Sequence, residues 1–373
     1  MPQRVLLNGY YGFGNLGDDL LMKISCHLID ELFPGAEITI CANGDHRHYI
    51  PPLTGKTVGL IKDDAKAEFD WIIDGGGGVY FDFTPGSVLH AAVNKFVSLI
   101  GAERWSKMLQ LYQHAKGNTG LRSKKRAGWG IGVGTYTRTS RRYFADVAKM
   151  ASYTFLMVRD NASAQHVEEM GIKCPVVVAS DIAFLRKYWM PDPFHSPSSA
   201  PCIGFILRDW FYGNEQNFKA VKQVAELLEA EGHRIMFFSF DASDKAYADF
   251  FSAFEPAIWQ PEKLTMNDFF KKIASCNLII TSRAHGAIIP ACMGIPLVGL
   301  AIEPKLEVVF DWFKDSSKLI SYPVHADQLL STIRLQLERL DHSRNLISEE
   351  VNKQESIMEA GIRTFAELLQ KCR

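Results

Sequence analysis

Cysteine is scarce in this chain, and its few thiols are scattered. The 373 residues include seven cysteines and no CxxC pair. Isolated thiols in apolar runs are typical of buried, reduced side chains and disfavour a disulfide framework or a zinc site. We therefore expect no metal and a reducing, cytoplasmic location. The cysteines are Cys26, Cys41, Cys174, Cys202, Cys276, Cys292 and Cys372.

An excess of charge of either sign is also missing. The formal net charge is -1 and the isoelectric point is near 6.8. No global field therefore draws the protein to nucleic acid, and any affinity for anions must come from a local cluster. Hydrophobic residues make up 47% and charged residues 22%, which is typical of a folded globular protein. The length favours two domains of similar size.

No stretch is typical of a signal peptide or a membrane span. The N-terminus leads straight into a strand-like run at residues 4–8. Residues 286–302 carry no charge, but two prolines and two glycines interrupt them. We interpret this stretch as a buried helix, a tight turn and a buried parallel strand.

Strand-like apolar runs alternate with helical patterns along the whole chain, which indicates parallel α/β architecture. Four prolines and three serines at residues 191–201 predict a linker. We expect an N-terminal α/β domain at 1–190 and a C-terminal one at 202–373, whose long last helix could pack back across the junction. The expected strands are 5–8, 37–42, 71–74, 127–132, 154–158, 176–179, 202–207, 234–240, 257–260, 278–281, 296–302 and 319–321.

This pattern predicts two Rossmann-like domains that face a central cleft. In open parallel sheets, ligands bind outside the carboxyl ends of the strands. Polar residues that directly follow the strands are therefore the candidates for function.

A glycine-rich loop follows the first strand. Gly12, Gly14 and Gly17 match the GxGxxG fingerprint of dinucleotide-binding proteins. That interpretation needs an acidic residue after the second strand, which instead ends in Cys41-Ala42-Asn43. Asp18 and Asp19 at the helix N-terminus would also repel a pyrophosphate. We therefore expect neither a nicotinamide nor a flavin cofactor.

An open turn that holds a polyhydroxylated sugar would use Gly14, Asn15 and Asp18 together. The alternative, a tight turn with an acidic cap, explains Asp18 but not Asn15. A second glycine run, residues 75–78, follows another buried strand and includes Gly76 and Gly77. Backbone without side chains allows a ligand to approach closely. We place a sugar on this side of the cleft.

Basic side chains follow several expected strands of both halves. Because they lie at equivalent strand ends, we expect them to converge on a small, highly charged anion beside a helix N-terminus. The alternative is that each arginine pairs with the acid next to it, Asp160 or Asp209, and that His285 caps a helix. The candidates are Arg159, Arg208, Ser282, Arg283, His285 and Lys305.

These motifs occur in an order that resembles the polysaccharide pyruvyl transferases over nearly the whole chain. The most specific block is Ser-Arg-x-His-Gly at residues 282–286 with Gly-Ile-Pro at 294–296. The other matching motifs are Gly-x-Gly-Asn-x-Gly-Asp at 12–18, the glycine run at 75–78, Val-Arg-Asp at 158–160 with Ser163 and Gly171, and Ser180-Asp181.

The resemblance implies a GT-B-like architecture, phosphoenolpyruvate as donor and no redox cofactor. It implies that Arg159, Arg283, His285 and Lys305 hold the phosphate and the carboxylate of the donor. It further implies that a sugar of a polysaccharide, or of its lipid-linked precursor, lies near Asn15, Asp18 and residues 75–78. The activity would belong to exopolysaccharide biosynthesis.

Formation of a pyruvate ketal needs an acid, a base and neutralisation of an anionic donor. His285 is the best acid or phosphate ligand, because imidazole titrates near neutral pH. Arg283 would hold developing charge without changing its protonation state. Asp18 is the candidate base, with Asp19 or Asp181 as alternatives.

Two other functions stay open. A GT-B glycosyltransferase would use a nucleotide sugar, and Glu303 could bind its ribose. A non-catalytic binding protein would keep the cleft, but the Arg and His of the 282–286 block favour chemistry.

The segment that precedes the fourth expected strand allows peripheral membrane contact without a span. Residues 87–114 have apolar residues at near-helical spacing, and a basic cluster at 116–126 follows, with Lys124, Lys125 and Arg126 at its end. Such a pair could lie on an anionic bilayer surface. The alternative is two ordinary amphipathic helices followed by a solvated basic loop.

Overall fold

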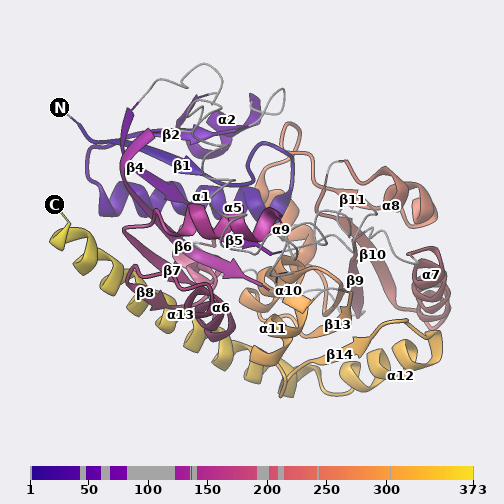
Figure 1. The fold of residues 1–373 in the computed structure, drawn as a ribbon. Helices are drawn as coiled ribbons and strands as arrows, with labels where there is room; N and C mark the ends of the chain where they lie inside the picture. Colours follow the sequence, from indigo (N-terminus) through magenta and orange to yellow (C-terminus); the bar gives the residue numbers. More distant parts are fainter. Residues whose placement is uncertain are drawn as a thin grey trace.

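The protein forms two parallel β-sheets, each with helices on its faces, in a computed structural model (Figure 1). This confirms the expected fold class. The structure describes residues 2–42, 48–59, 68–81, 122–134, 136, 141–190, 201–208, 214–241, 243–302 and 304–372. The predicted linker therefore lies outside the described residues except for Pro201, and the boundaries of the two domains stay a prediction.

The first sheet has the order β3-β2-β1-β4-β6-β7-β8, with β5 paired to β6. All of its pairings are parallel. Its strands are β1 (Arg4–Asn8), β2 (Glu37–Cys41), β3 (Thr57–Gly59), β4 (Glu68–Asp74), β5 (Gly77–Tyr80), β6 (Arg122–Val133), β7 (Phe155–Val158) and β8 (Val176–Val178). Its helices are α1 (Leu16–Leu32), α2 (Ile50–Thr54), α5 (Arg141–Met150) and α6 (Asn161–Glu169), followed by the short turns η2 (Ile182–Phe184) and η3 (Arg186–Tyr188).

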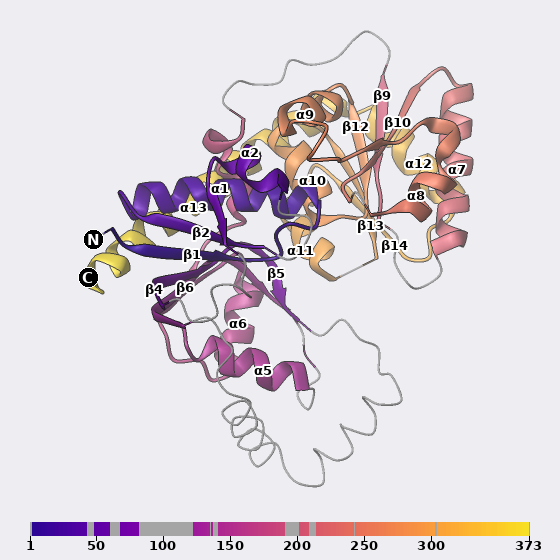
Figure 2. The same cartoon turned by 90° about the horizontal axis from the view of Figure 1, so that it is seen from above.

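The second sheet has the order β11-β10-β9-β12-β13-β14 and is also parallel. Figure 2 shows the two sheets side by side. Its strands are β9 (Cys202–Ile206), β10 (Arg234–Ser239), β11 (Ala257–Ile258), β12 (Leu278–Thr281), β13 (Leu297–Ala301) and β14 (Lys318–Ser321). Its helices are α7 (Asn214–Ala230), α8 (Lys245–Phe250), α9 (Met266–Ala274), α10 (Ala284–Cys292), α11 (Pro304–Trp312), α12 (Ala326–Leu337) and α13 (Leu340–Lys371), with the turn η4 (Ser252–Phe254) after α8.

Each sheet has a point at which its strand order reverses. β1 lies between β2 and β4, and β9 lies between β10 and β12. Helices that leave neighbouring strands toward opposite faces open a crevice at such a point. The loops after β1, β4, β9 and β12 are therefore the positions at which the fold offers a ligand site.

The charge-free stretch at 286–302 is buried protein, as predicted. It holds most of α10, a turn in which Gly294 has a φ of 74°, and β13. Every residue of α10 from Gly286 onward is buried. No helix in the described part of the chain is long and apolar enough to cross a membrane.

Three basic residues, which the alternative interpretation placed in a solvated loop, instead belong to β6, which begins five residues earlier than expected. Lys124 Nζ lies 2.8 Å from Asp70 Oδ1, and Arg126 Nη1 lies 3.4 Å from Asp74 Oδ2. Lys125 bonds the carbonyl oxygen of Cys372. Pairing with the parallel strand β4 outweighed the low strand propensity of these lysines and arginines. Residues 87–114 lie outside the described residues, so membrane contact stays a prediction.

The strands β3 and β5 were not expected from the sequence. Both contain glycine, which is depleted in strands. β5 begins with the last two glycines of the run and continues to Tyr80, and it forms because residues Ile131–Val133 of β6 offer a parallel partner. The run was predicted to follow a buried strand and to let a ligand approach, and only Gly75 and Gly76 lie outside strands.

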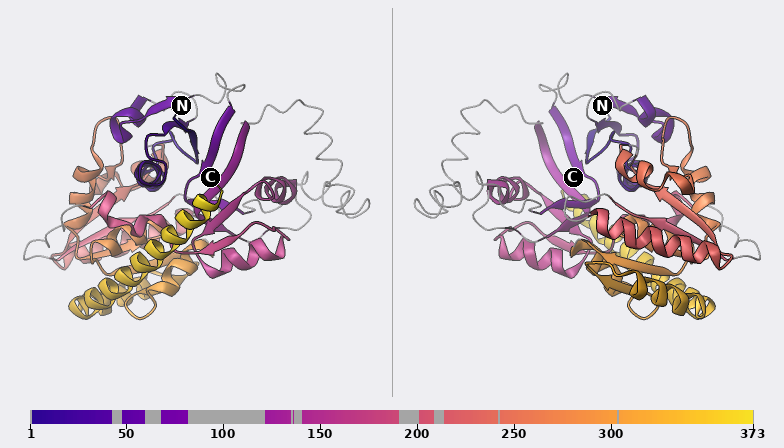
Figure 3. Two further views of the ribbon diagram at one scale, coloured as in Figure 1. Left: turned by 90° about the vertical axis from the view of Figure 1, so that its left-hand side faces the viewer. Right: turned by 90° about the vertical axis from the view of Figure 1, so that its right-hand side faces the viewer.

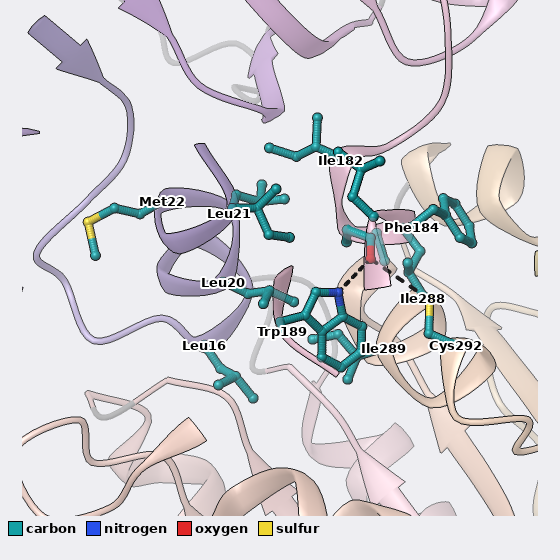
Figure 4. Close-up of a cluster of buried hydrophobic side chains, with 14 of the residues drawn as sticks. Leu16, Leu20, Leu21, Met22, Ile182, Phe184, Trp189, Ile288, Ile289 and Cys292 are labelled. Atoms are coloured by element: carbon teal, nitrogen blue, oxygen red, sulfur yellow. Dashed lines mark hydrogen bonds between the residues drawn. The ribbon is translucent and has the colours of Figure 1, made fainter. Parts of the chain in front are cut away.

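One apolar core joins the two halves of the molecule. Figure 4 shows α1 and α10 on either side of the turn that contains Ile182 and Phe184. Trp189 fills the space between them, and its Nε1 donates to the carbonyl oxygen of Ala183 at 2.9 Å. The contributing side chains include Leu16, Leu20, Leu21, Phe184, Trp189, Ile288, Ile289 and Cys292.

The last helix, α13, crosses from the second sheet to the first (Figure 3). Phe365 packs on Phe155 and Trp129 of the first sheet, with ring centroids 4.6 and 5.4 Å apart. Ser180 Oγ donates to Gln354 Oε1 at 2.7 Å. The end of the chain therefore contributes to the core of the N-terminal sheet.

Candidate active site

A cavity of about 500 Å³ lies between the two sheets, at the carboxyl ends of their central strands. Both halves of the chain line it. The lining residues are Asn8, Gly9, Tyr10, Asn15, Asp18, Asp74, Gly75, Gly76, Gly77, Phe81, Arg142, Arg159, Arg208, Phe240, Asp241, Arg283, Ala284, His285 and Lys305.

Most of the residues predicted for the site are in this cavity. Asn15, Asp18, Gly76 and Gly77 line it from the first half, as does Arg159. The second half contributes the other four, which are Arg208, Arg283, His285 and Lys305.

Two of the predicted residues, Gly14 and Ser282, lie behind the cavity wall. Gly14 N donates to Tyr49 Oη at 2.9 Å, and Arg208 N donates to Ser282 Oγ at 3.0 Å. Both residues therefore support the loops that carry the lining residues.

Asn15 is the N-cap of α1. Its Oδ1 accepts from the backbone N of Gly17 at 3.1 Å and of Asp18 at 3.4 Å. Side-chain capping satisfies amides at the start of a helix that have no intrahelical partner. Helix geometry therefore explains Asn15 as well as the glycines, and the carboxylate of Asp18 is not needed as a cap.

The start of α1 is fastened to the second half of the chain. Leu16 N donates to the carbonyl oxygen of Phe240 at 2.9 Å, and Asn15 forms a bridge with Asp241. An added Cβ on Gly17 would lie 2.3 Å from Nδ1 of His285. Only glycine lets the helix and the imidazole approach this closely.

Asp18 is an acidic residue of the first half that lines the same cavity as the basic residues of the second half. Burial raises the pKa of its carboxyl, and the charges of His285, Lys305 and Arg283 act in the opposite direction. Its Oδ1 also lies 3.8 Å from where a Cβ of Gly77 would be, so it reaches the glycine run.

Asp19 is a structural carboxylate. Its two oxygens accept from Tyr49 Oη and Trp259 Nε1, each at 2.8 Å. Burial raises its pKa to about 7, against the effect of these two hydrogen bonds. It does not line the cavity and instead links α1 to the loop after β11.

Arg159 contacts two acids behind the cavity. Its Nε lies 3.3 Å from Asp160 Oδ2, and its Nη1 lies 3.9 Å from Asp181 Oδ2. The guanidinium lies over Gly132, where an added Cβ would be 2.7 Å from its Cζ. The alternative pairing with Asp160 is therefore present, yet Arg159 still lines the cavity.

Asp181 and His285 form a buried pair across the two halves. Nε2 of His285 lies 3.7 Å from Oδ2 of Asp181, and both atoms are buried without a hydrogen-bond partner. Burial raises the pKa of Asp181, but His285 and Arg159 outweigh it and bring the pKa below its ordinary value. Asp181 is therefore ionised and faces two charged neighbours, Arg159 and His285, and it is not among the residues that line the cavity.

Arg283 and His285 owe their positions to the turn between β12 and α10. Thr281 Oγ1 accepts from Arg283 N at 3.0 Å, and Arg283 Nε donates to the carbonyl oxygen of Leu207 at 3.1 Å. Arg283 is the N-cap residue, so His285 does not cap the helix. Asp209, the proposed partner of Arg208, lies outside the described residues.

Several lining residues were not predicted from the sequence. Asp74 ends β4, and its carboxylate accepts hydrogen bonds from Asn8 Nδ2 and, at 2.8 Å, from Tyr153 Oη. Lys149 Nζ lies 3.1 Å from Oδ1 of Asp74. The place of Asp74 at a strand end was a usable signal, as was that of Asp241 after β10. Arg142 of α5 enters from a helix, which no strand-end rule finds. Tyr10 and Phe81 were also missed.

A sequence model described as "Polysaccharide pyruvyl transferase" matches residues 15–304. The chain belongs to the polysaccharide pyruvyl transferase family. The matched range includes all of the predicted site residues except Gly14 and Lys305. No match was found among curated proteins.

Solved structures support the GT-B-like fold of this family member. It is similar to the HepE protein of Anabaena in complex with UDP-glucose, at 11% identity and a TM-score of 0.57, covering 99% of this chain and 100% of that one. UDP-GlcNAc 2-epimerase of Neisseria meningitidis matches with the same identity, TM-score and coverage. A putative UDP-N-acetylglucosamine 2-epimerase of Listeria monocytogenes has 13% identity and a TM-score of 0.56, covering 98% and 97%.

Proposed function

We propose that this family member transfers the enolpyruvyl group of phosphoenolpyruvate to a sugar and forms a pyruvate ketal. The observation that carries the proposal is the convergence of five basic side chains that follow strands, together with Arg142 of α5, on one cavity of a polysaccharide pyruvyl transferase. The five follow strands of both sheets, so segments that are far apart in the sequence each contribute to the cavity. They are Arg159, Arg208, Arg283, His285 and Lys305.

The donor carries a phosphate and a carboxylate, and both need cations. Arginine forks bind such groups through paired N–H donors, whereas lysine acts as a point charge. We place the donor against Arg208, Arg283 and Lys305, beside the N-terminus of α10. Arg159 then faces it from the first half, with Ser282 supporting Arg208 from behind.

His285 is the proposed acid. Its Nε2 faces the ionised Asp181, which stabilises an imidazolium and orients the ring. C3 of the enolpyruvyl group takes a proton and becomes a methyl carbon. Asp181 acts here through His285, as a positioning residue.

Asp18 is the proposed base, because Asp19 and Asp181 are both occupied by other contacts. It accepts a proton from a sugar hydroxyl as that oxygen bonds to C2. The C2–O bond to phosphate breaks, and the second hydroxyl bonds to C2. The two hydroxyl protons end on C3 and on the departing phosphate, so atoms and charge balance.

The acceptor is a sugar of a polysaccharide or of its lipid-linked precursor, in exopolysaccharide biosynthesis. Its proposed place is the first-half side of the cavity, against Asn15, Asp18, Gly76 and Gly77. Seven unpaired cysteines support a cytoplasmic setting.

The test supplies the intact protein with phosphoenolpyruvate labelled in its pyruvyl carbons and with bacterial glycans. We expect phosphate release that depends on the glycan, with transfer of the label. A thermal scan gives an independent measure, in which phosphoenolpyruvate raises the melting temperature and NADH and FAD do not. Turnover of UDP-glucose, without any effect of phosphoenolpyruvate, would instead identify a nucleotide-sugar glycosyltransferase.

A further inference from the structure

Tyr10 is unusual among the large apolar side chains of the described residues, because 60% of its surface is exposed. The next most exposed of them, Val178, reaches 43%. Tyr10 also lines the cavity between the two sheets. An aromatic ring held open to a binding cavity is a candidate contact surface for a ligand.

The loop that carries Tyr10 fixes its direction. Tyr11, the next residue, turns inward and is 1% exposed, with its hydroxyl where a Cβ of Gly75 would be. Gly12 and Gly14 have φ values of 87° and 68°, which only glycine adopts easily. Gly14 N donates a hydrogen bond to Tyr49 Oη. The loop is therefore held from behind while Tyr10 points outward.

Phe13 supports the ring from one side. The two rings are stacked, with centroids 4.0 Å apart and planes 11° from parallel. Such a pair is a flat, rigid apolar surface that loses little conformational entropy when a ligand covers it.

Charged groups surround this surface. Asp18 and Asp241 raise the pKa of Tyr10, after burial as the main cause, and Arg208 lowers it. Carboxylates beside an aromatic face suit a neutral ligand with hydroxyl groups at its edge and C–H groups on its face. A small anion such as phosphoenolpyruvate has no apolar face that could cover the two rings.

We infer that Tyr10, stacked on Phe13, is a subsite that binds the C–H face of a pyranose ring at the mouth of the cavity. Asp18 and Asp241 accept hydrogen bonds from the hydroxyls of the same ring. The inference rests on the proposed function, because it assigns this ring to the acceptor. It also adds an apolar contact to an acceptor site so far made of glycine, asparagine and aspartate.

Saturation-transfer NMR on the intact protein without phosphoenolpyruvate tests the subsite directly. The probes are the methyl glycosides of glucose, galactose and mannose at millimolar concentration. We expect saturation to pass mainly to the C–H protons of one ring face. Tyr10→Ala should weaken binding about three- to tenfold, and Tyr10→Phe should retain it, since the ring supplies the contact. Leu227→Ala, which removes an exposed side chain (42%) from α7, is the control for a general surface effect.

The outcomes separate this inference from the proposed function. If Tyr10→Ala binds the glycosides as tightly as the wild type does, the subsite is wrong. It is also wrong if no glycoside binds the wild type. Loss of stabilisation by phosphoenolpyruvate in Tyr10→Ala would assign the ring to the donor and also overturn it. Binding of uridine at Tyr10, in place of the glycosides, would also overturn the inference. Glycoside binding that depends on Tyr10, in a protein that phosphoenolpyruvate does not stabilise, would keep the subsite and reject the transferase proposal.

Discussion

At the scale of the residue, the contact between Asp181 and His285 matters most for the proposed chemistry. The two buried polar atoms face each other at 3.7 Å, and no hydrogen bond satisfies either of them. Unsatisfied buried groups are costly, so they are kept where a function needs them. A small closing movement, or a proton on the imidazole, would complete the bond.

We expect His285→Ala to lose about 10²- to 10⁴-fold in kcat, the range for removal of a general acid. Phosphoenolpyruvate should still raise the melting temperature, because three other cations remain on the second-half side of the cavity. Steady-state phosphate release, with circular dichroism as the check on folding, measures the effect. A folded variant with near-native turnover would show that His285 is not the acid.

Asp18→Asn tests the base through the pH dependence of kcat/KM. The carboxyl must be ionised to accept a proton, so activity falls as pH drops through its pKa. Because burial raises that pKa, the acid limb should lie above the ordinary aspartate value of about 3.9. The variant should lose most activity and this limb together. Asp241→Asn, a second carboxyl of the cavity, is the control and should retain the limb.

At the scale of the element, the first turn of α1 is a joint between the two sheets. It is capped by Asn15, bonded to Phe240 through Leu16, and in contact with His285 at Gly17. Asp19 adds a hydrogen bond to Trp259. The glycine fingerprint of this loop therefore serves contact between domains, in addition to the turn.

Gly17→Ala should reduce kcat strongly with little loss of fold. The new methyl would lie 2.3 Å from Nδ1 of His285, so the imidazole must shift from its position beside Asp181. Alanine suits the helix itself better than glycine does. Turnover and urea unfolding are measured for each variant. Gly171→Ala would be a poor control, because the positive φ of Gly171 makes alanine strained there. Ser356→Ala, on the exposed side of α13, is the matched control. Unchanged turnover in Gly17→Ala would contradict the close approach.

At the scale of the whole molecule, a shared core and α13 hold the two sheets together. The core includes side chains from α1, α10 and the turn at Ile182–Phe184. α13 begins beside the second sheet and ends beside the first, so it ties the halves a second time. A cavity formed by both sheets needs such a frame if its cations are to keep their spacing.

Phe365→Ala should destabilise the protein by about 3–5 kcal/mol, the usual cost of removing a buried phenylalanine. Phe365 is fully buried against Phe155 and Trp129. Ile357→Ala on the same helix, at 36% exposure, should stay within about 0.5 kcal/mol of the wild type. Urea unfolding followed by tryptophan fluorescence compares them. Equal effects would mean that α13 is not packed on the first sheet.

Most of the fold could be predicted because each central strand carries its own signal. Phe155–Val158 and Leu278–Thr281 are apolar except for Thr281, and both are buried throughout, which is the pattern of a strand covered on both faces. β5 and the first half of β6 lack that signal. Two glycines begin β5, and a run of basic residues starts β6. Both segments became strands because a partner strand lies beside them.

The sequence by itself determined two parallel sheets, their order along the chain and the strand ends that carry Arg159, Arg208 and Arg283. Local patterns suffice for these features, since burial and turn chemistry act within a few residues. Only the tertiary structure decided that His285 faces Asp181, and that Tyr10 is exposed while Tyr11 is buried. Those outcomes depend on which atoms from distant segments share one volume, and close packing between the two halves fixes them.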